Sequence, residues 1–233
     1  MGRAGSTEVK CVVFDIDDTL YLERDYVRSG FRAVGDWVRG ELGVNSFSEE
    51  AWRSFEMGRR GDIFNVALQT LGIPASEELI RTLLSVYRGH DPAISLLPDS
   101  EQCLRSVTGK AFVGVISDGA LLGQQMKVGR LGLVSRCNHI ILTESIGPEY
   151  SKPHPRAFME MQQVADCPPQ ACTYIADNPI KDFIAPNRLG WRTIRVRRLG
   201  GLHCEKNCSE ESQPSIEIKD LSELPALLNL ANA

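Results

Sequence analysis

The 233-residue chain has no apolar run long enough to cross a bilayer and no excess of basic residues. The first absence excludes a membrane-spanning helix, which needs about 20 apolar residues. The second argues against a broad nucleic-acid surface, since the formal net charge is -4. The polar start, Met1 to Lys10, also lacks the apolar middle of a signal peptide. We therefore expect a protein without a membrane or nucleic-acid partner.

The cysteines do not form the pattern of a disulfide framework. There are seven of them, an odd number, and they are scattered through apparent strands and helices, as Cys11, Cys103 and Cys172 illustrate. This pattern is typical of buried free thiols in a reducing compartment. We expect a cytoplasmic protein, and its length suits one sizeable domain with a smaller one inserted.

Short apolar runs alternate with stretches of helical spacing along most of the chain. The runs have the length and near-continuous apolar composition of strands that are covered on both faces. This alternation predicts an α/β protein with a doubly wound, Rossmann-like parallel sheet. The expected strands are Val9 to Asp15, Ala111 to Ser117, Asn138 to Leu142, Cys172 to Asp177, Trp191 to Val196 and, at the edge, Ile216 to Ile218; the expected helices are Ser100 to Val107, Leu121 to Leu131, Pro155 to Val164, Ile180 to Leu189 and Leu221 to Leu230.

Residues 22–91 break this alternation, because no strand pattern is found there. Apolar side chains fall on one helical face from Tyr26 to Val38 and again from Leu79 to Tyr87. We expect a small helical bundle inserted after the first strand. The predicted domains are therefore a helical insert, 22–91, and an α/β core made of 1–21 and 92–233.

Polar residues stand at the ends of the expected strands. Three acids crowd the end of the first strand, and buried carboxylates are costly unless they are paired or neutralised. A divalent cation would relieve their repulsion. Because the carboxyl ends of parallel strands share one edge, distant residues can converge there. The residues are Asp15, Asp17 and Asp18, then Ser117 and Asp118, Lys152, Asp177 and Asp182.

This set resembles the haloacid dehalogenase superfamily of hydrolases, most of which are phosphatases. All four signature motifs are present in order between Val9 and Val196, and the first is complete as Asp15, Asp17 and Thr19. The insert is similar to the helical cap of that family. One departure is Ala176, which stands where a glycine often precedes the first aspartate of the fourth motif.

The resemblance implies distinct roles for the two aspartates of the first motif. Asp15 would attack phosphorus and form an aspartyl-phosphate. Asp17 would protonate the leaving alcohol and then activate the hydrolytic water. Its backbone carbonyl, rather than its carboxylate, would touch the metal. The alternative is that Asp17 and Asp18 merely cap a turn.

Three residues are expected to bind the transferred phosphoryl group. Ser117 offers a hydroxyl donor at the start of the next helix, where free N–H groups favour an anion. Asp118 belongs to the same phosphate-binding loop and is expected to cap that helix. Lys152 would offset the charges of the phosphoryl oxygens and of Asp15. A solvated surface lysine is the alternative for Lys152.

A magnesium ion follows from the charges as well as from the resemblance. Asp15 and Asp177 are the expected carboxylate ligands, with Asp17 contributing its backbone. A phosphate monoester brings about two negative charges at neutral pH, and Lys152 alone cannot offset four. Mg²⁺ prefers oxygen ligands and bridges carboxylates to phosphate.

The remaining candidates have weaker patterns. Thr19 and Asp182 are expected to contact the catalytic and metal-binding residues rather than the substrate. Asp182 would orient Lys152 or a metal-bound water. The alternative for Asp182 is an ordinary acid in the first turn of a helix. Two further groups are interpreted as surface features. They are the incomplete zinc set His203, Cys204 and Cys208, and the strand-end charges Arg192, Arg195, Arg197 and Arg198.

Together these features predict a Mg²⁺-dependent phosphatase, a monomer or homodimer, that acts on a small phosphorylated metabolite. A cap limits access, so a sugar phosphate or nucleotide suits it better than a phosphoprotein. A haloacid dehalogenase is a rival, but members of that branch lack the second aspartate, here Asp17. A phosphomutase would share every core residue. A non-catalytic binding or regulatory module is the third alternative.

Overall fold

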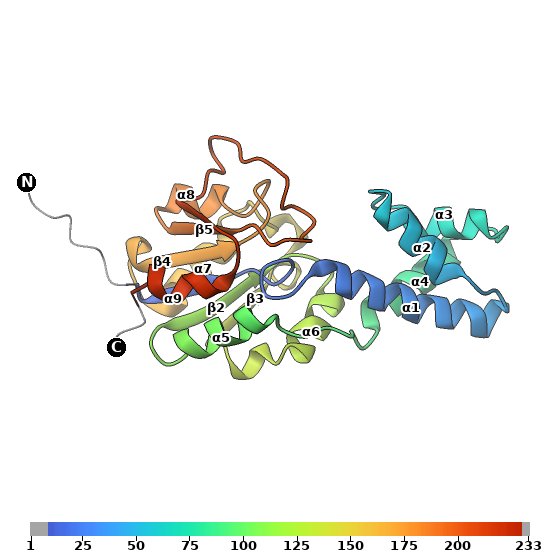
Figure 1. Cartoon of the computed structure of the whole chain (residues 1–233), viewed down its shortest axis with the longest axis horizontal. Helices are drawn as coiled ribbons and strands as arrows, with labels where there is room; N and C mark the ends of the chain where they lie inside the picture. Colours follow the sequence, from blue (N-terminus) through green and yellow to red (C-terminus); the bar gives the residue numbers. More distant parts are fainter. Residues whose placement is uncertain (1–8, 230–233) are drawn as a thin grey trace, which may run out of the picture. The chain divides into compact units, whose positions relative to one another are not determined.

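The computed structural model describes residues 9–229. Its larger unit contains a six-stranded sheet in the order β3-β2-β1-β4-β5-β6, and every neighbouring pair is parallel (Figure 1). The doubly wound α/β fold is thereby confirmed. The strands are β1 (Cys11–Phe14), β2 (Phe112–Ser117), β3 (His139–Leu142), β4 (Cys172–Ala176), β5 (Arg192–Val196) and β6 (Ile216–Ile218).

Alternation of side chains along the strands divides the core between the two faces of the sheet. Cys11 and Val13 of β1 pack with Tyr174 of β4 and with Phe158 and Met161, which come from a helix on that face. The helices of this unit are α5 (Pro98–Val107), α6 (Leu121–Arg130), α7 (Arg156–Ala165), α8 (Ile184–Leu189) and α9 (Leu224–Leu227), with 3₁₀ turns η1 (Leu133–Ser135), η2 (Thr143–Ser145), η3 (Pro148–Tyr150), η4 (Pro169–Ala171) and η5 (Leu221–Glu223).

The smaller unit, residues 24–94, is helical, and the larger unit comprises the chain on either side of it. Rings from its helices form an aromatic core, in which Phe31 lies against Phe55 and Phe64, and Phe64 against Tyr87. Gly30 lets two helices approach closely, because a Cβ there would lie 2.4 Å from the Tyr87 ring. Its helices are α1 (Glu23–Leu42), α2 (Phe47–Glu56), α3 (Ile63–Thr70) and α4 (Glu77–Gly89).

Two helices differ from the sequence prediction at their ends. α8 begins at Ile184 rather than Ile180, because the Asn178 side chain accepts the Ile180 N–H and ties a separate turn. The expected closing helix is interrupted, with η5 and α9 covering its first part and residue 230 lying outside the described residues. Among residues 9–229, no helix is long and apolar enough to span a membrane.

Candidate active site

The site lies at the carboxyl edge of the sheet, where the ends of β1, β2 and β4 meet. Asp15 follows β1 directly, and its backbone N–H bonds to the Ile175 carbonyl at 2.9 Å, so the strand geometry continues to the acid. Ser117 is the last residue of β2, and Asp177 follows β4. Asp15, Ser117 and Asp177 are all buried. The structure thus brings these predicted residues together around one edge.

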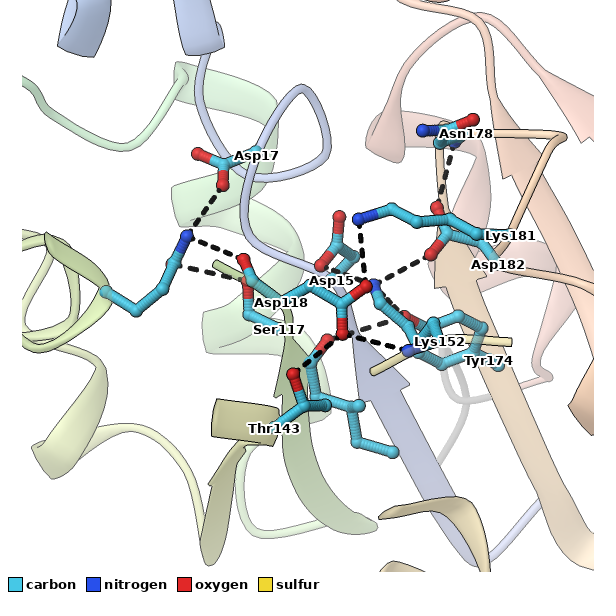
Figure 2. A network of polar contacts seen from close by, with 12 residues as sticks. Asp15, Asp17, Ser117, Asp118, Thr143, Lys152, Tyr174, Asn178, Lys181 and Asp182 are labelled. Carbon is cyan, nitrogen blue, oxygen red and sulfur yellow. Dashed lines mark hydrogen bonds and ion pairs between the residues drawn. The ribbon is translucent and has the colours of Figure 1, made fainter. Parts of the chain in front are cut away.

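Lys152 occupies the centre of this edge. Figure 2 shows its amine joined to Asp15 at 2.9 Å, Asp182 at 2.7 Å and the Tyr174 hydroxyl at 3.0 Å. Burial would lower the pKa of Lys152, but the charges of Asp15 and Asp182 raise it well above its usual value. The amine is therefore charged, and the alternative of a solvated surface lysine is wrong. Tyr174 was not identified from the sequence, because a tyrosine within an apolar strand reads as core.

Three carboxylates, including that of Asp15, gather at this edge of the sheet. Oxygen atoms of Asp15, Asp177 and Asp182 lie within 4.8 Å of one another, and all three residues are buried. Burial raises the pKa of Asp15 to about 6, against the opposing charge of Lys152. Burial, followed by the charges of Asp182 and Asp15, raises the pKa of Asp177 well above its usual value. The carboxylates that crowd Asp15 therefore come from the end of β4 and the loop after it, and not from Asp17 and Asp18 as the sequence predicted.

This cluster fits a hard divalent cation. Oδ2 of Asp177 is buried and has no hydrogen-bond partner among the residues that the structure describes. An unpaired carboxylate oxygen costs free energy in the core unless a cation faces it. The ligand atoms that these three residues offer are carboxylate oxygens, which is the donor type that Mg²⁺ prefers.

Asp182 supports Lys152 rather than a helix end. One oxygen pairs with Lys152, and the other accepts the Asn178 N–H at 2.9 Å. It therefore holds both the lysine and the loop that follows β4. Asp182 precedes α8, so the alternative of an acid in the first turn of that helix is wrong. Neither Asp177 nor Asn178 adjoins α8, whose N-cap is Phe183.

Asp17 is held by α6, an element that sequence reasoning did not connect with it. Its carboxylate accepts hydrogen bonds from Lys127 at 2.7 and 2.8 Å, from Gln124 at 3.0 Å and from the Tyr21 hydroxyl. Burial would raise the pKa of Asp17, but the charge and hydrogen bond of Lys127 lower it below its usual value. Lys127 and Gln124 are buried polar residues one turn apart on α6. The sequence pattern that could have indicated this contact is the presence of two polar residues on the buried face of a helix.

Ser117 lies between the strand and this helix. Its hydroxyl donates to Gln124 at 3.3 Å. The sequence predicts Ser117 at the start of this helix. α6 begins only at Leu121, however, so Ser117 precedes it. The intervening Gly119 has φ of +127° and lies close to Gln124, 2.9 Å from where a Cβ would be. A glycine is therefore required for this turn.

Asp118 binds lysines and does not cap α6. Its Oδ1 accepts bonds from the Thr143 hydroxyl at 2.8 Å and the Lys152 N–H at 3.1 Å, and its Oδ2 pairs with Lys181 at 3.0 Å (Figure 2). Ala120 occupies the N-cap of α6, without a side-chain bond. The predicted cap is wrong because these stronger, charge-assisted partners take the carboxylate. Lys181, a second cation beside the site, was not predicted.

The turn after Asp17 is closed by Asp18. This residue has φ of 51°, and its carboxylate accepts N–H groups of Glu23 at 2.8 Å and Leu202 at 2.7 Å. The turn-capping alternative therefore holds for Asp18 and not for Asp17. Thr19 is fully buried, and its carbonyl accepts a bond from Arg198 at 2.8 Å.

Two strand-end arginines are structural, which corrects their interpretation as solvated charges. Arg195 is 1% exposed and donates to the Asp177 carbonyl at 3.1 Å. It also donates to the carbonyls of His203 and Lys206, and so ties the long loop to the site. Arg198 is likewise buried. Within the described residues, the ligand atoms of His203 do not gather with cysteines into a metal-binding group.

The family of the chain follows from comparison with known proteins. Residues 9–190 match the haloacid dehalogenase-like hydrolases. The protein belongs to this family of hydrolases, which confirms the resemblance drawn from the four motifs.

Individual relatives are more specific in name. The chain is 27% identical to glyceraldehyde 3-phosphate phosphatase of Methanopyrus kandleri, covering 93% of this chain and 95% of the relative. It is 26% identical to the enzyme of the same name from Methanothermobacter thermautotrophicus, covering 94% and 100%.

Solved structures share the fold. YfnB of Bacillus subtilis, determined bound to magnesium, superimposes with a TM-score of 0.70 at 17% identity, covering 96% of this chain and 100% of that one. A 2-haloacid dehalogenase of Pseudomonas syringae gives a TM-score of 0.66 at 24% identity, covering 95% and 98%. At these identities the likeness concerns the fold alone, so the chemistry has to be argued from the site.

Proposed function

We propose that the protein is a Mg²⁺-dependent phosphatase that hydrolyses a small phosphomonoester through an aspartyl-phosphate on Asp15. The observation that carries this proposal is the position of Asp15. Its buried carboxylate pairs with the charged amine of Lys152 at 2.9 Å and lies within 4.8 Å of an oxygen of Asp177, whose Oδ2 has no hydrogen-bond partner among the described residues. A nucleophilic carboxylate facing a phosphate dianion needs positive charge on both sides. The names of the two relatives support the same reaction class.

Asp15, Asp177 and the Asp17 backbone carbonyl would hold Mg²⁺, which supplies charge that screens and positions the phosphoryl group. The raised pKa values of Asp15 and Asp177 support this assignment. Both groups resist ionisation without a cation, and both would be ionised beside one.

The protein residues divide the remaining work. An oxygen of Asp15 bonds to phosphorus as the bond to the leaving oxygen breaks, and Asp17 gives that oxygen a proton. Asp17 next takes a proton from water, whose oxygen attacks phosphorus and restores Asp15. Lys152 stabilises the charge on the phosphoryl oxygens, and the Ser117 hydroxyl donates a hydrogen bond to them.

The contacts of Asp17 suit the second step. Lys127 favours the ionised carboxylate, which is the form that activates water. For the first step Asp17 must carry a proton. The negative charge of an arriving phosphate would raise its pKa and favour that form.

Rival functions account less well for this site. A dehalogenase expels a halide and needs no general acid, whereas Asp17 is held by Lys127, Gln124 and Tyr21. Burial of ionisable groups is costly, and a non-catalytic module has no use for four of them at one edge of the sheet. The four groups are Asp15, Lys152, Asp177 and Asp182. A phosphomutase would use the same residues, and product analysis distinguishes it.

The first experiment measures orthophosphate released from a panel of phosphomonoesters with Mg²⁺ present. Glyceraldehyde 3-phosphate is the first member because of the relatives' names, and sugar phosphates and nucleotides follow. Release should occur with at least one compound, and Asp15→Asn should abolish it without changing the circular dichroism. Isomerised sugar phosphate in place of free phosphate would indicate a mutase. Full release by Asp15→Asn would refute the covalent route.

We also propose that the helical insert, 22–91, acts as a cap that restricts the substrate to small molecules. Its support is the compact helical unit at 24–94, which enters the chain directly after the motif containing Asp15 and Asp17. Such a cap would exclude bulk water from the reaction. A cytoplasmic location is proposed as well, supported by seven free cysteines.

A further inference from the structure

Three cysteines meet at the opposite end of the sheet from Asp15. Cys11 begins β1 and Cys172 begins β4, and the two are register partners on adjacent parallel strands, so their side chains leave the same face. Cys167 lies in the connection between α7 and β4. The three sulfur atoms lie within 4.8 Å of one another, and the sulfurs of Cys167 and Cys172 are 3.3 Å apart.

The sulfur triangle has the size of a metal site. With one side of 3.3 Å and the others no longer than 4.8 Å, all three sulfurs can lie within about 2.6 Å of one central point, close to the 2.3 Å typical of a zinc–thiolate bond. The sulfurs are too far apart to be bonded, since a disulfide needs about 2.05 Å. Sulfur-only donors favour thiophilic cations over Mg²⁺.

The surroundings favour a thiophilic cation over water. Cys11 and Cys172 are fully buried within the apolar cluster of Val13 and Phe158. Cys167 is only partly buried, so the triangle is open to solvent at that corner. Lys10 acts electrostatically on Cys167. Its positive charge would partly offset the net negative charge of the complex that a thiophilic cation forms with three thiolates.

The thiols of Cys167 and Cys172 hold their protons more tightly than free thiols do. Its hydrogen bond with Cys11, followed by burial, raises the pKa of Cys172 far above its usual range, and burial raises the pKa of Cys167 to about 12. Each thiol that coordinates must therefore release its proton to solvent. Metal–sulfur bonds replace the weak thiol hydrogen bonds, such as that from Cys172 to the Pro168 carbonyl at 3.6 Å.

We propose that Cys11, Cys167 and Cys172 bind one thiophilic d¹⁰ cation, Zn²⁺ or Cu⁺, as a structural clip. The cation would tie β1, β4 and the α7–β4 connection together. It would lie about 13 Å along β1 from Asp15, taking about 3.3 Å per residue, and so would not take part in phosphate chemistry. A cation that binds only the folded state stabilises that state.

The test is titration of the reduced, metal-free chain, kept in excess Mg²⁺ with a phosphine reductant. Zn²⁺, Co²⁺ as its coloured substitute, and Cu⁺ as a weak nitrile complex are added in separate arms. One equivalent of Zn²⁺ or Cu⁺ per chain should bind and raise the melting temperature by several degrees. Thiolate-to-metal absorption should appear with Co²⁺ or Cu⁺. This absorption reports sulfur ligands, so cations at the oxygen-lined Asp177 site do not produce it.

Variants then locate the site. Cys167→Ser changes one partly buried sulfur and should weaken binding by about 100-fold or more, as removal of a ligand implies. Cys137→Ser, also partly buried, and the double variant Cys204→Ser/Cys208→Ser should bind as the parent does. Phosphate release should be the same in all three variants. Absence of a sulfur-bound equivalent in the parent, retention of it in Cys167→Ser, or loss of it in either control would overturn the proposal.

Discussion

Lys152 places a positive charge in the core between the carboxylates of Asp15 and Asp182. Its side chain is inaccessible to solvent, so neither acid can be hydrated from that side. Removing one member of such a group leaves the others buried and unpaired, which costs more than the attraction itself. In the proposed mechanism the lysine therefore has two roles, since it stabilises the folded core and offsets charge in the transition state.

Lys152→Met should lower phosphate release by about 100-fold or more, as loss of one charge-stabilising donor does elsewhere. Stability should fall by about 3 to 5 kcal/mol from the unpaired carboxylates. Steady-state kinetics and urea unfolding measure the two effects. Lys152→Arg is the matched control that keeps the charge; it should fold better than Lys152→Met and remain slow, because a planar guanidinium does not fit between the same oxygens. Parent-like turnover in Lys152→Met would contradict the role.

In the proposed mechanism Lys127 acts through Asp17, whose carboxylate it pairs with at 2.7 Å. Its charge lowers the pKa of that carboxyl, so Lys127→Met should raise it. Because water activation requires the ionised form, the acidic limb of the rate profile should move to higher pH. Activity at pH 5 should fall by more than activity at pH 8. A pH profile of kcat checks this, with Lys110→Met as a control on a residue outside the site; an unmoved acidic limb in Lys127→Met would refute it.

At the scale of elements, the turn between β2 and α6 decides where Ser117 and Gln124 lie. Gly119 permits that turn, because φ of +127° is strained for any other residue. Gln124 in turn contacts both Ser117 and Asp17. The turn therefore links the Ser117 hydroxyl to the Asp17 carboxylate through Gln124.

Gly119→Ala should destabilise the protein by about 1 to 3 kcal/mol, through backbone strain and contact with Gln124. Gly129→Ala is the control, since it lies in α6 with open space around it. That change should stabilise by up to about 1 kcal/mol, because alanine favours a helix. Urea unfolding of both variants measures the difference. Equal effects of the two changes would show that the turn is not strained.

The regular elements were predictable from local pattern, whereas several connections were not. All six strands lie within the expected runs. β1 and β4 are buried along their whole length, which demands an apolar composition, whereas the edge strand β6 is only partly buried. The cap predicted at Asp118 failed because Lys181 and Thr143, distant in sequence, compete for its carboxylate. The start of α8 was misplaced because Asp182 folds the preceding loop back on itself.

At the scale of the whole molecule, we expect the acidic cluster to couple stability to Mg²⁺ and pH. The pKa of Asp15 is about 6 in the folded, metal-free protein, above the usual value of about 3.9. The folded state therefore holds a proton that the unfolded chain releases between these values. The stabilising contribution of this group is present at low pH and is lost as pH rises through about 6. The raised pKa of Asp177 has the same sign.

Mg²⁺ should reverse this loss, because it binds the ionised carboxylates. The rise in melting temperature that Mg²⁺ causes should be larger at pH 7.5 than at pH 5, and chelation should remove it. Differential scanning calorimetry with and without Mg²⁺ measures both values. Asp177→Asn is the control and should respond little at either pH. A rise independent of pH, or one retained by Asp177→Asn, would place the cation elsewhere.

The sequence by itself determined the alternation of strand and helix, the helical insert and the family, because apolar periodicity and short motifs are local properties of a chain. It also indicated Asp15, Asp17, Ser117, Lys152 and Asp177 as candidates. Only the tertiary structure decided which partners surround them. Lys127 reaches Asp17 across 110 positions, and Cys11 meets Cys172 through strand pairing. Such partners are set by the packing of separate elements, and no local pattern encodes that packing.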